Sequence, residues 1–325
     1  MGINPILALQ GALGILTAVF VAGWWAAIAG VRRAPRAADS PATETGAPGA
    51  THVGTGALTN FFDTLGIGSF ATTTAIFRAL RMVPDRFIPG TLNVGHTLPT
   101  VVQAVIYTSI IQVDILTLFA FIAAAVLGAW LGAGVVSSWP KQKVQIGMGA
   151  ALLGAAVLML MTQMNMFPGG GDALGVRGTK LAVGVGVNFL LGALMSLGIG
   201  LYAPCMILVS LLGMNPTAAF PIMMGSCAFL MPVGSLRFIR EQCYSVRAAL
   251  GLAVGGIPGV LLAAFIVKSM PIYAVRWLVI VVVVYTAVTM LRAGLRGEPA
   301  GAGQDDGPLT ELERHRYTDS TDEHG

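Results

Sequence analysis

Long apolar segments alternate with short polar or basic segments along most of the chain. The first apolar segment covers residues 6–30, and Arg32, Arg33 and Arg36 follow it. Further segments reach the length of about 20 residues that a membrane-spanning helix needs: 90–112, 115–137, 143–165, 217–238, 247–268 and 273–293. The pattern predicts an all-helical integral membrane protein.

Two other apolar segments are interrupted by glycine near their middle. Residues 53–81 are broken at 66–69, and residues 181–213 are broken at 198–201. A half of about 14 residues gives roughly 20 Å of helix, which is too short to cross about 30 Å of hydrocarbon. We therefore expect two re-entrant hairpins of half-helices, with their tips near the middle of the membrane. An alternative in which each broken segment forms two full helices stays open.

The two broken segments are copies of one motif. LGIGSFA at residues 65–71 returns as LGIGLYA at residues 197–203, which is an offset of 132. Three further pairs share this offset: Met82 with Met214, Pro84 with Pro216, and Pro89 with Pro221. Glycine-broken segments at corresponding places in two halves of an apolar chain point to a transporter-like duplication and its binding site.

These patterns predict six parts. They are an N-terminal transmembrane helix (1–31), a flexible cytoplasmic linker (32–52), a first transmembrane repeat (53–166), an external loop (167–180), a second transmembrane repeat (181–295) and a disordered cytoplasmic tail (296–325). Each repeat consists of a broken hairpin followed by three transmembrane helices. Because three is an odd number, the two halves would enter the membrane from opposite faces and form an inverted repeat.

The distribution of basic residues agrees with this topology. If both hairpins return to the side they came from, most arginines and lysines face the cytoplasm, as the positive-inside rule requires. Only Arg177, Lys180, Lys268 and Arg276 then lie near the outer face. The same arrangement places the N-terminus outside and the C-terminus in the cytoplasm.

Composition narrows the class of protein further. The chain of 325 residues is 55% hydrophobic and 10% charged, whereas soluble domains carry about 25% charged residues. The net charge of +4 does not indicate a nucleic-acid partner, because the basic residues lie in short loops. The three cysteines have no metal-ligand or disulfide spacing, and no catalytic triad, P-loop or CxxC motif is present. We therefore expect no enzyme activity, no cofactor and no bound metal.

The hairpin tips are the predicted binding site. Free N–H groups at the start of a half-helix favour an anion, and glycine removes side chains that would hold a ligand away. The predicted substrate-binding residues are Gly66, Gly68, Ser69, Thr72 and Thr73 at the first tip, and Gly198, Gly200, Tyr202 and Cys205 at the second. The alternative is that the glycines only permit tight packing and the threonines bond their own backbone.

A polar stripe follows the first hairpin. Asn93, His96, Thr100, Gln103 and Tyr107 are spaced at 3, 4, 3 and 4 residues, so they share one helix face. Polar side chains in a bilayer usually face a cavity or a polar partner, and we expect Asn93, His96 and Gln103 to line the ligand pathway. The alternative for His96 is a hydrogen bond to a neighbouring helix.

Asp63 lies about one turn before the first tip, within an apolar stretch. It is a candidate proton relay, or a hydrogen-bonded carboxyl that fixes the hairpin. Asn60 and Asn188 lie within the hairpins and could tie half-helices together. Asp114 falls in a short outer turn, where we expect a solvated carboxylate.

The glycine-rich break that opens each half and the prolines after it resemble the sulfite exporter TauE/SafE family, also called the four-span toluene sulfonate uptake permease family. The resemblance covers residues 53–295 and implies a bacterial inner-membrane transporter of sulfite, sulfonates or similar small anions. The family's break runs GxGGG, whereas the third glycine is here replaced by Ser69 in one half and Leu201 in the other. These departures and the added first helix indicate a divergent member.

The residues and the resemblance together predict a secondary transporter of a small anion, with a sulfur-containing anion as the expected substrate, that works by alternating access of inverted repeats. A channel-like anion pathway and a non-transporting membrane scaffold are the alternatives. Candidate partners are the lipid bilayer, the small anionic substrate and a second copy of the chain in a homodimer.

Overall fold

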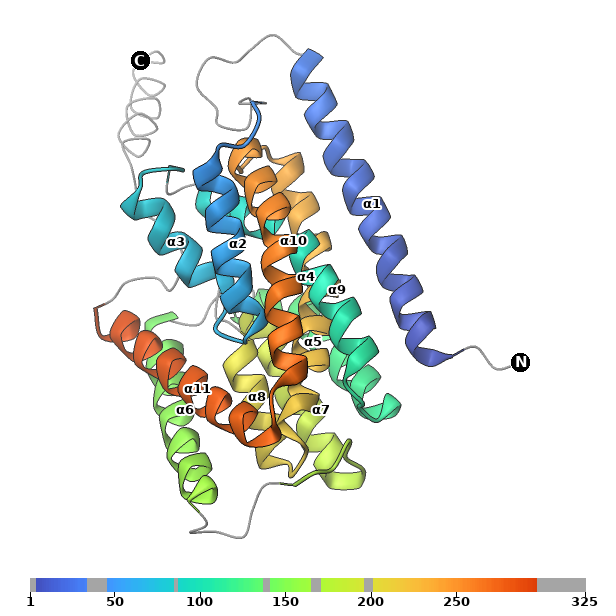
Figure 1. Cartoon of the computed structure of the whole chain (residues 1–325), viewed down its shortest axis with the longest axis vertical. Helices are drawn as coiled ribbons and strands as arrows, with labels where there is room; N and C mark the ends of the chain where they lie inside the picture. The colour runs from blue at the N-terminus through green and yellow to red at the C-terminus, as the bar shows by residue number, and fades with distance from the viewer. Residues whose placement is uncertain are drawn as a thin grey trace, which may run out of the picture.

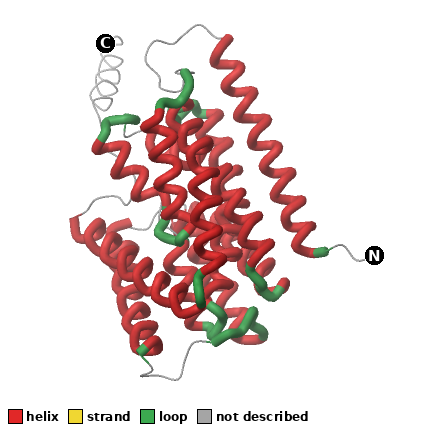
Figure 2. Tube along the Cα trace, viewed as in Figure 1, coloured by secondary structure: helices red, strands yellow, loops and turns green. Residues whose placement is uncertain are grey.

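The computed structural model describes residues 4–33, 46–84, 87–136, 141–164, 171–195 and 201–296, and this part of the chain is helical without strands (Figures 1 and 2). The helices are α1 Pro5–Arg33, α2 Ala50–Thr64, α3 Ser69–Ala79, α4 Ile88–Ile110, α5 Ile115–Val136, α6 Lys141–Gln163, α7 Gly178–Met195, α8 Tyr202–Leu211, the short 3-10 helix η3 Pro216–Ala218, α9 Ala219–Arg240, α10 Val246–Ser269 and α11 Ile272–Arg296. The all-helical prediction is confirmed. Most of the predicted linker, the tail from residue 297, Gly198 and Gly200 lie outside the described residues.

Several helices are long and apolar enough to cross a membrane, which supports a membrane protein. Within the described residues they are Pro5–Gly30, Gly178–Met195, Pro216–Arg240, Val246–Ser269 and Tyr273–Arg296. By contrast, α3 and α8 have 11 and 10 residues, or roughly 15–17 Å at 1.5 Å per residue. Neither can cross about 30 Å of hydrocarbon as an α-helix, so the described lengths favour hairpins over pairs of full helices. With 18 residues and an apolar composition, α7 is long enough to cross a membrane, so the prediction that each half of a broken segment is too short to cross is wrong for this helix.

The two halves contain the same order of helices, and helices of one half pack mainly against helices of the other. The set α2 to α6 corresponds to the set α7 to α11, with η3 added before α9. The hairpin helix α2 packs on α10 of the second half, and its counterpart α7 packs on α5 of the first. The remaining large contacts pair α4 with α9, α4 with α10 and α6 with α11. Each half is therefore completed by helices of the other.

Glycines let these exchanged helices approach closely. A Cβ at Gly56 would lie 2.7 Å from Leu252 Cα, and one at Gly255 would overlap the backbone carbonyl of Val53. In the other pair, a Cβ at Gly192 would overlap the carbonyl of Ala125. Small residues at such contacts allow dense packing where no hydrophobic effect drives helices together in lipid. Many of the glycines in the sequence are thus explained by helix packing alone.

Helix α1 lies along one side of the bundle (Figure 1). Phe20, Trp24 and Ile28 are buried against α4, α9 and α10. Residues on other sides of the same helix, such as Ile15 and Trp25, are 70% and 71% exposed. An apolar surface of this kind suits contact with lipid chains.

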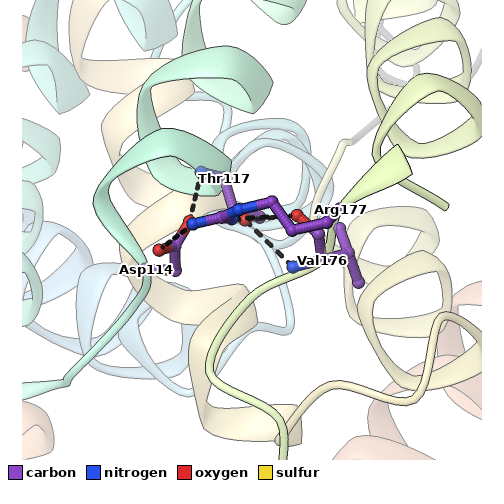
Figure 3. Close-up of polar contacts among 4 residues, drawn as sticks. All are labelled: Asp114, Thr117, Val176 and Arg177. Carbon is purple, nitrogen blue, oxygen red and sulfur yellow. Dashed lines mark hydrogen bonds and ion pairs between the residues drawn. The ribbon is translucent and has the colours of Figure 1, made fainter. Parts of the chain in front are cut away.

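The loop between the halves is fixed by Asp114 and Arg177 (Figure 3). The Arg177 guanidinium donates to both carboxylate oxygens of Asp114, at 2.5 and 2.6 Å. The Thr117 amide and hydroxyl donate to the same carboxylate, and the Val176 amide donates to the Thr117 hydroxyl. The expectation of a simply solvated Asp114 is therefore wrong, because Arg177, 63 residues away in sequence, is its bidentate partner.

This ion pair predicts a pH-dependent stability. Its hydrogen bonds with Arg177 hold the pKa of the Asp114 carboxyl well below its usual range. A depressed carboxyl pKa contributes stability that is present above the ordinary aspartate value of about 4 and is lost as the pH falls below it. We expect Asp114→Asn to lower the unfolding temperature slightly at pH 7, by about one to three degrees because the pair is exposed. The difference from the wild type should shrink near pH 3, and a difference that grows on acidification would contradict this account.

Candidate functional site

The first break is a glycine turn between α2 and α3. Helix α2 ends at Thr64, and α3 begins at Ser69. Between them, Gly66 and Gly68 have φ of 94° and 88°, a left-handed conformation that glycine adopts without steric cost. Figure 1 shows this turn about midway along the length of the molecule. The sequence motif therefore forms the chain reversal that its glycines predict.

Asp63 lies at the centre of the hydrogen bonds around this turn. Its side chain is 2% exposed. The Ser69 amide donates to Asp63 Oδ1 at 2.6 Å, and Gln103 Nε2 donates to Oδ2 at 2.9 Å. The Tyr202 hydroxyl, from the second half, donates to Oδ2 at 3.3 Å. The carboxyl group thus joins the end of α2, the start of α3, the polar face of α4 and the start of α8.

The Ser69 amide is the first amide of α3. An amide at this place was predicted from the sequence to bind the ligand. In the structure this amide is bonded to Asp63. The Asp63 carboxyl therefore fixes the hairpin, as one of the two readings of this residue expects. A ligand that uses the same amide would have to replace the carboxyl.

The predicted polar stripe of α4 faces the first hairpin. Its residues Thr100, Gln103 and Tyr107 are buried. Gln103 Nε2 also donates to Thr64 Oγ1 at 2.9 Å, and the Tyr107 hydroxyl donates to the Thr64 carbonyl at 3.0 Å. The stripe thus binds the end of α2. Thr64 is a member of this network that the sequence analysis missed, although it directly follows Asp63.

His96 is fully buried and bonded through both ring nitrogens. Its Nδ1 lies 3.0 Å from Asn60 Oδ1, and its Nε2 lies 3.0 Å from Thr73 Oγ1. Since Asn60 Nδ2 donates to the Gly56 carbonyl, its Oδ1 accepts, and the neutral tautomer with a proton on Nδ1 fits both contacts. His96 therefore links α2, α3 and α4, which is the neighbouring-helix alternative for this residue.

Other predicted residues have different partners. The Asn93 amide group donates to the Pro89 carbonyl within α4, and the Thr72 hydroxyl donates to the Ser69 carbonyl. Asn188 Nδ2 donates to the Phe121 carbonyl of α5 at 2.6 Å. Asn188 thus ties α7 to α5 rather than to the other half-helix. The proposed ligand contacts of Asn93 and Thr72 stay predictions.

The second broken segment meets the first. Besides the Tyr202 bond to Asp63, the side chain of Met206 lies against Gly66, where a Cβ would overlap Met206 Cε. Met206 follows Tyr202 by four residues, so both lie on one face of α8. This spacing is the signal by which sequence reasoning could have found Met206. Cys205, a predicted site residue, is fully buried in the core beside them.

The two glycines of the first turn differ in their surroundings. Gly66 is covered by Met206 and, at 3.7 Å, by Met223 Cε. At Gly68, by contrast, a Cβ would find no heavy atom within 4 Å. Gly68 is therefore the position at this tip where a small molecule has room beside the backbone.

No metal site is evident in the part of the chain that the structure describes, because it contains no cluster of three or more His, Cys, Asp or Glu side chains. The donors around the first turn are an amide, a carboxamide and a hydroxyl. Groups of this kind can bind an anion by hydrogen bonds without a formal positive charge.

Comparison with known proteins gives one family. Residues 180–318 match the family described as sulfite exporter TauE/SafE. No curated protein and no solved structure matched the chain. The matched residues cover the second half, so the likeness of residues 53–166 to the family depends on the internal repeat. With the apolar helices, the match supports membership of this membrane protein in the sulfite exporter TauE/SafE family.

Proposed function

We propose that the protein is a secondary transporter of a small anion, with sulfite or a sulfonate as the substrate class. The family's description as sulfite exporter supports export of a sulfur oxyanion. It also favours a transporter over an enzyme. The chain itself supplies no nucleotide-binding motif, so the driving force would be an ion gradient or the gradient of the anion.

The observation that carries this proposal is the contact between the two broken segments. Tyr202 of α8 reaches Asp63 beside the first turn, although 139 residues separate them. Backbone and side-chain donors from both halves thereby converge on one point, and Gly68 leaves room next to it. Neutral donors in a water-poor site stabilise negative charge strongly, because little solvent competes with them.

The proposed mechanism is alternating access between inverted halves. The exchange of α2 with α7 between the halves is what two related copies facing each other would produce. Rocking one half against the other would open the point of contact to each side in turn. We further propose a bacterial inner-membrane location, with the N-terminus outside and the C-terminus in the cytoplasm, and a homodimer as the candidate assembly.

Sulfite flux into proteoliposomes tests this function. Liposomes with the purified protein should take up sulfite faster than empty liposomes. The uptake rate should saturate with sulfite concentration, and sulfite trapped inside should accelerate uptake. Uptake that stays linear and lacks this acceleration would instead support the channel-like pathway. If sulfite and small sulfonates neither move nor raise the unfolding temperature of the protein, a non-transporting scaffold is the better assignment.

A further inference from the structure

The Asp63 carboxyl accepts hydrogen bonds from the same donors that would bind the proposed anion. It accepts from the Ser69 amide, from Gln103 and from Tyr202. The described salt bridges join other acids to basic residues, at Asp114, Asp172 and Glu241, and none involves Asp63. These donors stabilise one negative charge, but a transported anion at the same donors would add a second, and like charges in a buried site repel each other.

Gln103 provides an independent observation at the same place. Its side chain is fully buried, and its Oε1 atom has no hydrogen-bond partner among the described residues. Buried acceptors without partners are rare in proteins, because each has lost its hydrogen bonds to water without gaining others. If the Gln103 carboxamide rotates so that Oε1 and Nε2 exchange places, Oε1 can accept a hydrogen bond from a protonated Asp63 oxygen. The unpaired acceptor therefore points to a second state of the network, in which Asp63 carries a proton.

The helices that carry or contact Asp63 have few other titratable groups. Helix α2 itself carries His52 near its start, α4 contributes His96 and Tyr107, α8 contributes Tyr202 and Cys205, and α9 contributes Cys227. The remaining charged side chains of the packed helices lie at helix ends: Arg78 on α3, Lys180 on α7, Arg237 and Arg240 on α9, and Arg247 and Lys268 on α10. The hydrogen-bond partners of His96 are Asn60 and Thr73, which are both neutral. Asp63 is thus the acidic group of this network and its natural proton acceptor.

We propose that Asp63 is a built-in substitute for the transported anion, and that the anion replaces it at the Ser69 amide only when Asp63 takes up a proton. This inference rests on the proposed function and names its coupling ion. One proton would bind with each anion, so movement of the anion would be coupled to movement of a proton. In this step an Asp63 oxygen takes up a proton from water, and the donors that bound the carboxylate then donate to the anion. When the anion leaves, the proton leaves Asp63 as well.

Sulfite binding as a function of pH tests the proposal. The dissociation constant is measured between pH 5 and pH 9 from sulfite-dependent thermal stabilisation of wild type and Asp63→Asn. Sulfite itself gains a proton in this range, but its titration affects both proteins equally. The ratio of the wild-type to the variant dissociation constant therefore isolates Asp63. Linkage of one proton to one anion predicts that this ratio rises toward about tenfold per pH unit in the upper part of the range.

Asp114→Asn is the matched control, because it makes the same change in a loop far along the chain from the tip. Its ratio to the wild type should stay constant with pH over the range in which Asp114 is ionised. A constant ratio for Asp63→Asn as well would overturn the inference while leaving sulfite binding, and with it the proposed function, intact. Absence of sulfite binding by the wild type at every pH would overturn both.

Tyr202→Phe keeps the test decisive if Asp63→Asn does not fold. It removes one donor to the carboxylate and leaves the acid in place. Hydrogen bonds to a carboxylate favour its charged form. The sulfite dissociation constant of Tyr202→Phe should therefore rise with pH as steeply as that of the wild type, but the rise should begin at a higher pH. An unchanged pH dependence in Tyr202→Phe would contradict the proposal.

Discussion

Replacing Gly255 by leucine is expected to prevent the protein from accumulating in a folded form. A Cβ at this position would overlap the carbonyl of Val53, so α2 and α10 would have to separate. The contact is between backbones, and no side-chain rotation can relieve it. Overpacking of a core already costs about 1–3 kcal/mol when side chains can adjust, and we expect a larger loss here. Size-exclusion chromatography and thermal unfolding of the detergent-extracted protein measure the effect.

The matched control is Gly186→Leu on α7. This glycine is exposed, and a Cβ there would meet no heavy atom within 4 Å. The variant should yield monodisperse protein with nearly wild-type stability. If Gly255→Leu were as stable as Gly186→Leu, the close packing of α2 on α10 would be refuted.

Replacing Gly68 by leucine should lower sulfite flux about tenfold or more while the protein remains folded. The leucine side chain would enter the open space beside the first turn, where the proposed anion lies. The left-handed backbone of Gly68, with φ of 88°, adds a strain of about 1–3 kcal/mol for any other residue. The loss of stability must therefore be measured separately from the loss of flux in proteoliposomes.

Gly213→Leu separates these two effects. Gly213 has a similar φ of 82° and lies in the loop after α8, where a Cβ would meet only Lys180 Nζ at 3.6 Å. It should show a comparable loss of stability and a nearly wild-type flux. Undiminished sulfite flux in Gly68→Leu would remove the hairpin tip from the mechanism.

The order and type of the helices could be predicted from the sequence, because long apolar segments have few structural solutions in a membrane. The turn at residues 66–69 was also predictable, since two glycines close together in an apolar run can supply the positive φ that a chain reversal needs. The stripe on α4 followed from its helical spacing, and the structure buries it against the hairpin. These features could be predicted because each depends on residues that lie close together in the sequence.

Partners distant in sequence could not be predicted in the same way. Nothing in the spacing joins Asp63 to Tyr202 or Asp114 to Arg177, because these contacts arise only when the helices pack. The occupation of the Ser69 amide by Asp63 also depends on the path of the turn. Single-sequence patterns therefore identified the elements of the candidate site, whereas their connections required the folded chain.

The central claim is that the two hairpins enter from opposite faces of the membrane and meet at the anion site. Ala79 and Leu211 are exposed, occupy equivalent places 132 residues apart, and end α3 and α8. With the native cysteines replaced by alanine, Ala79→Cys and Leu211→Cys can be tested singly with a membrane-impermeant thiol reagent.

In intact cells, the reagent should label Leu211→Cys and should reach Ala79→Cys only after the membrane is permeabilised. Labelling of both positions from the same side would contradict the inverted arrangement and the anion site built on it.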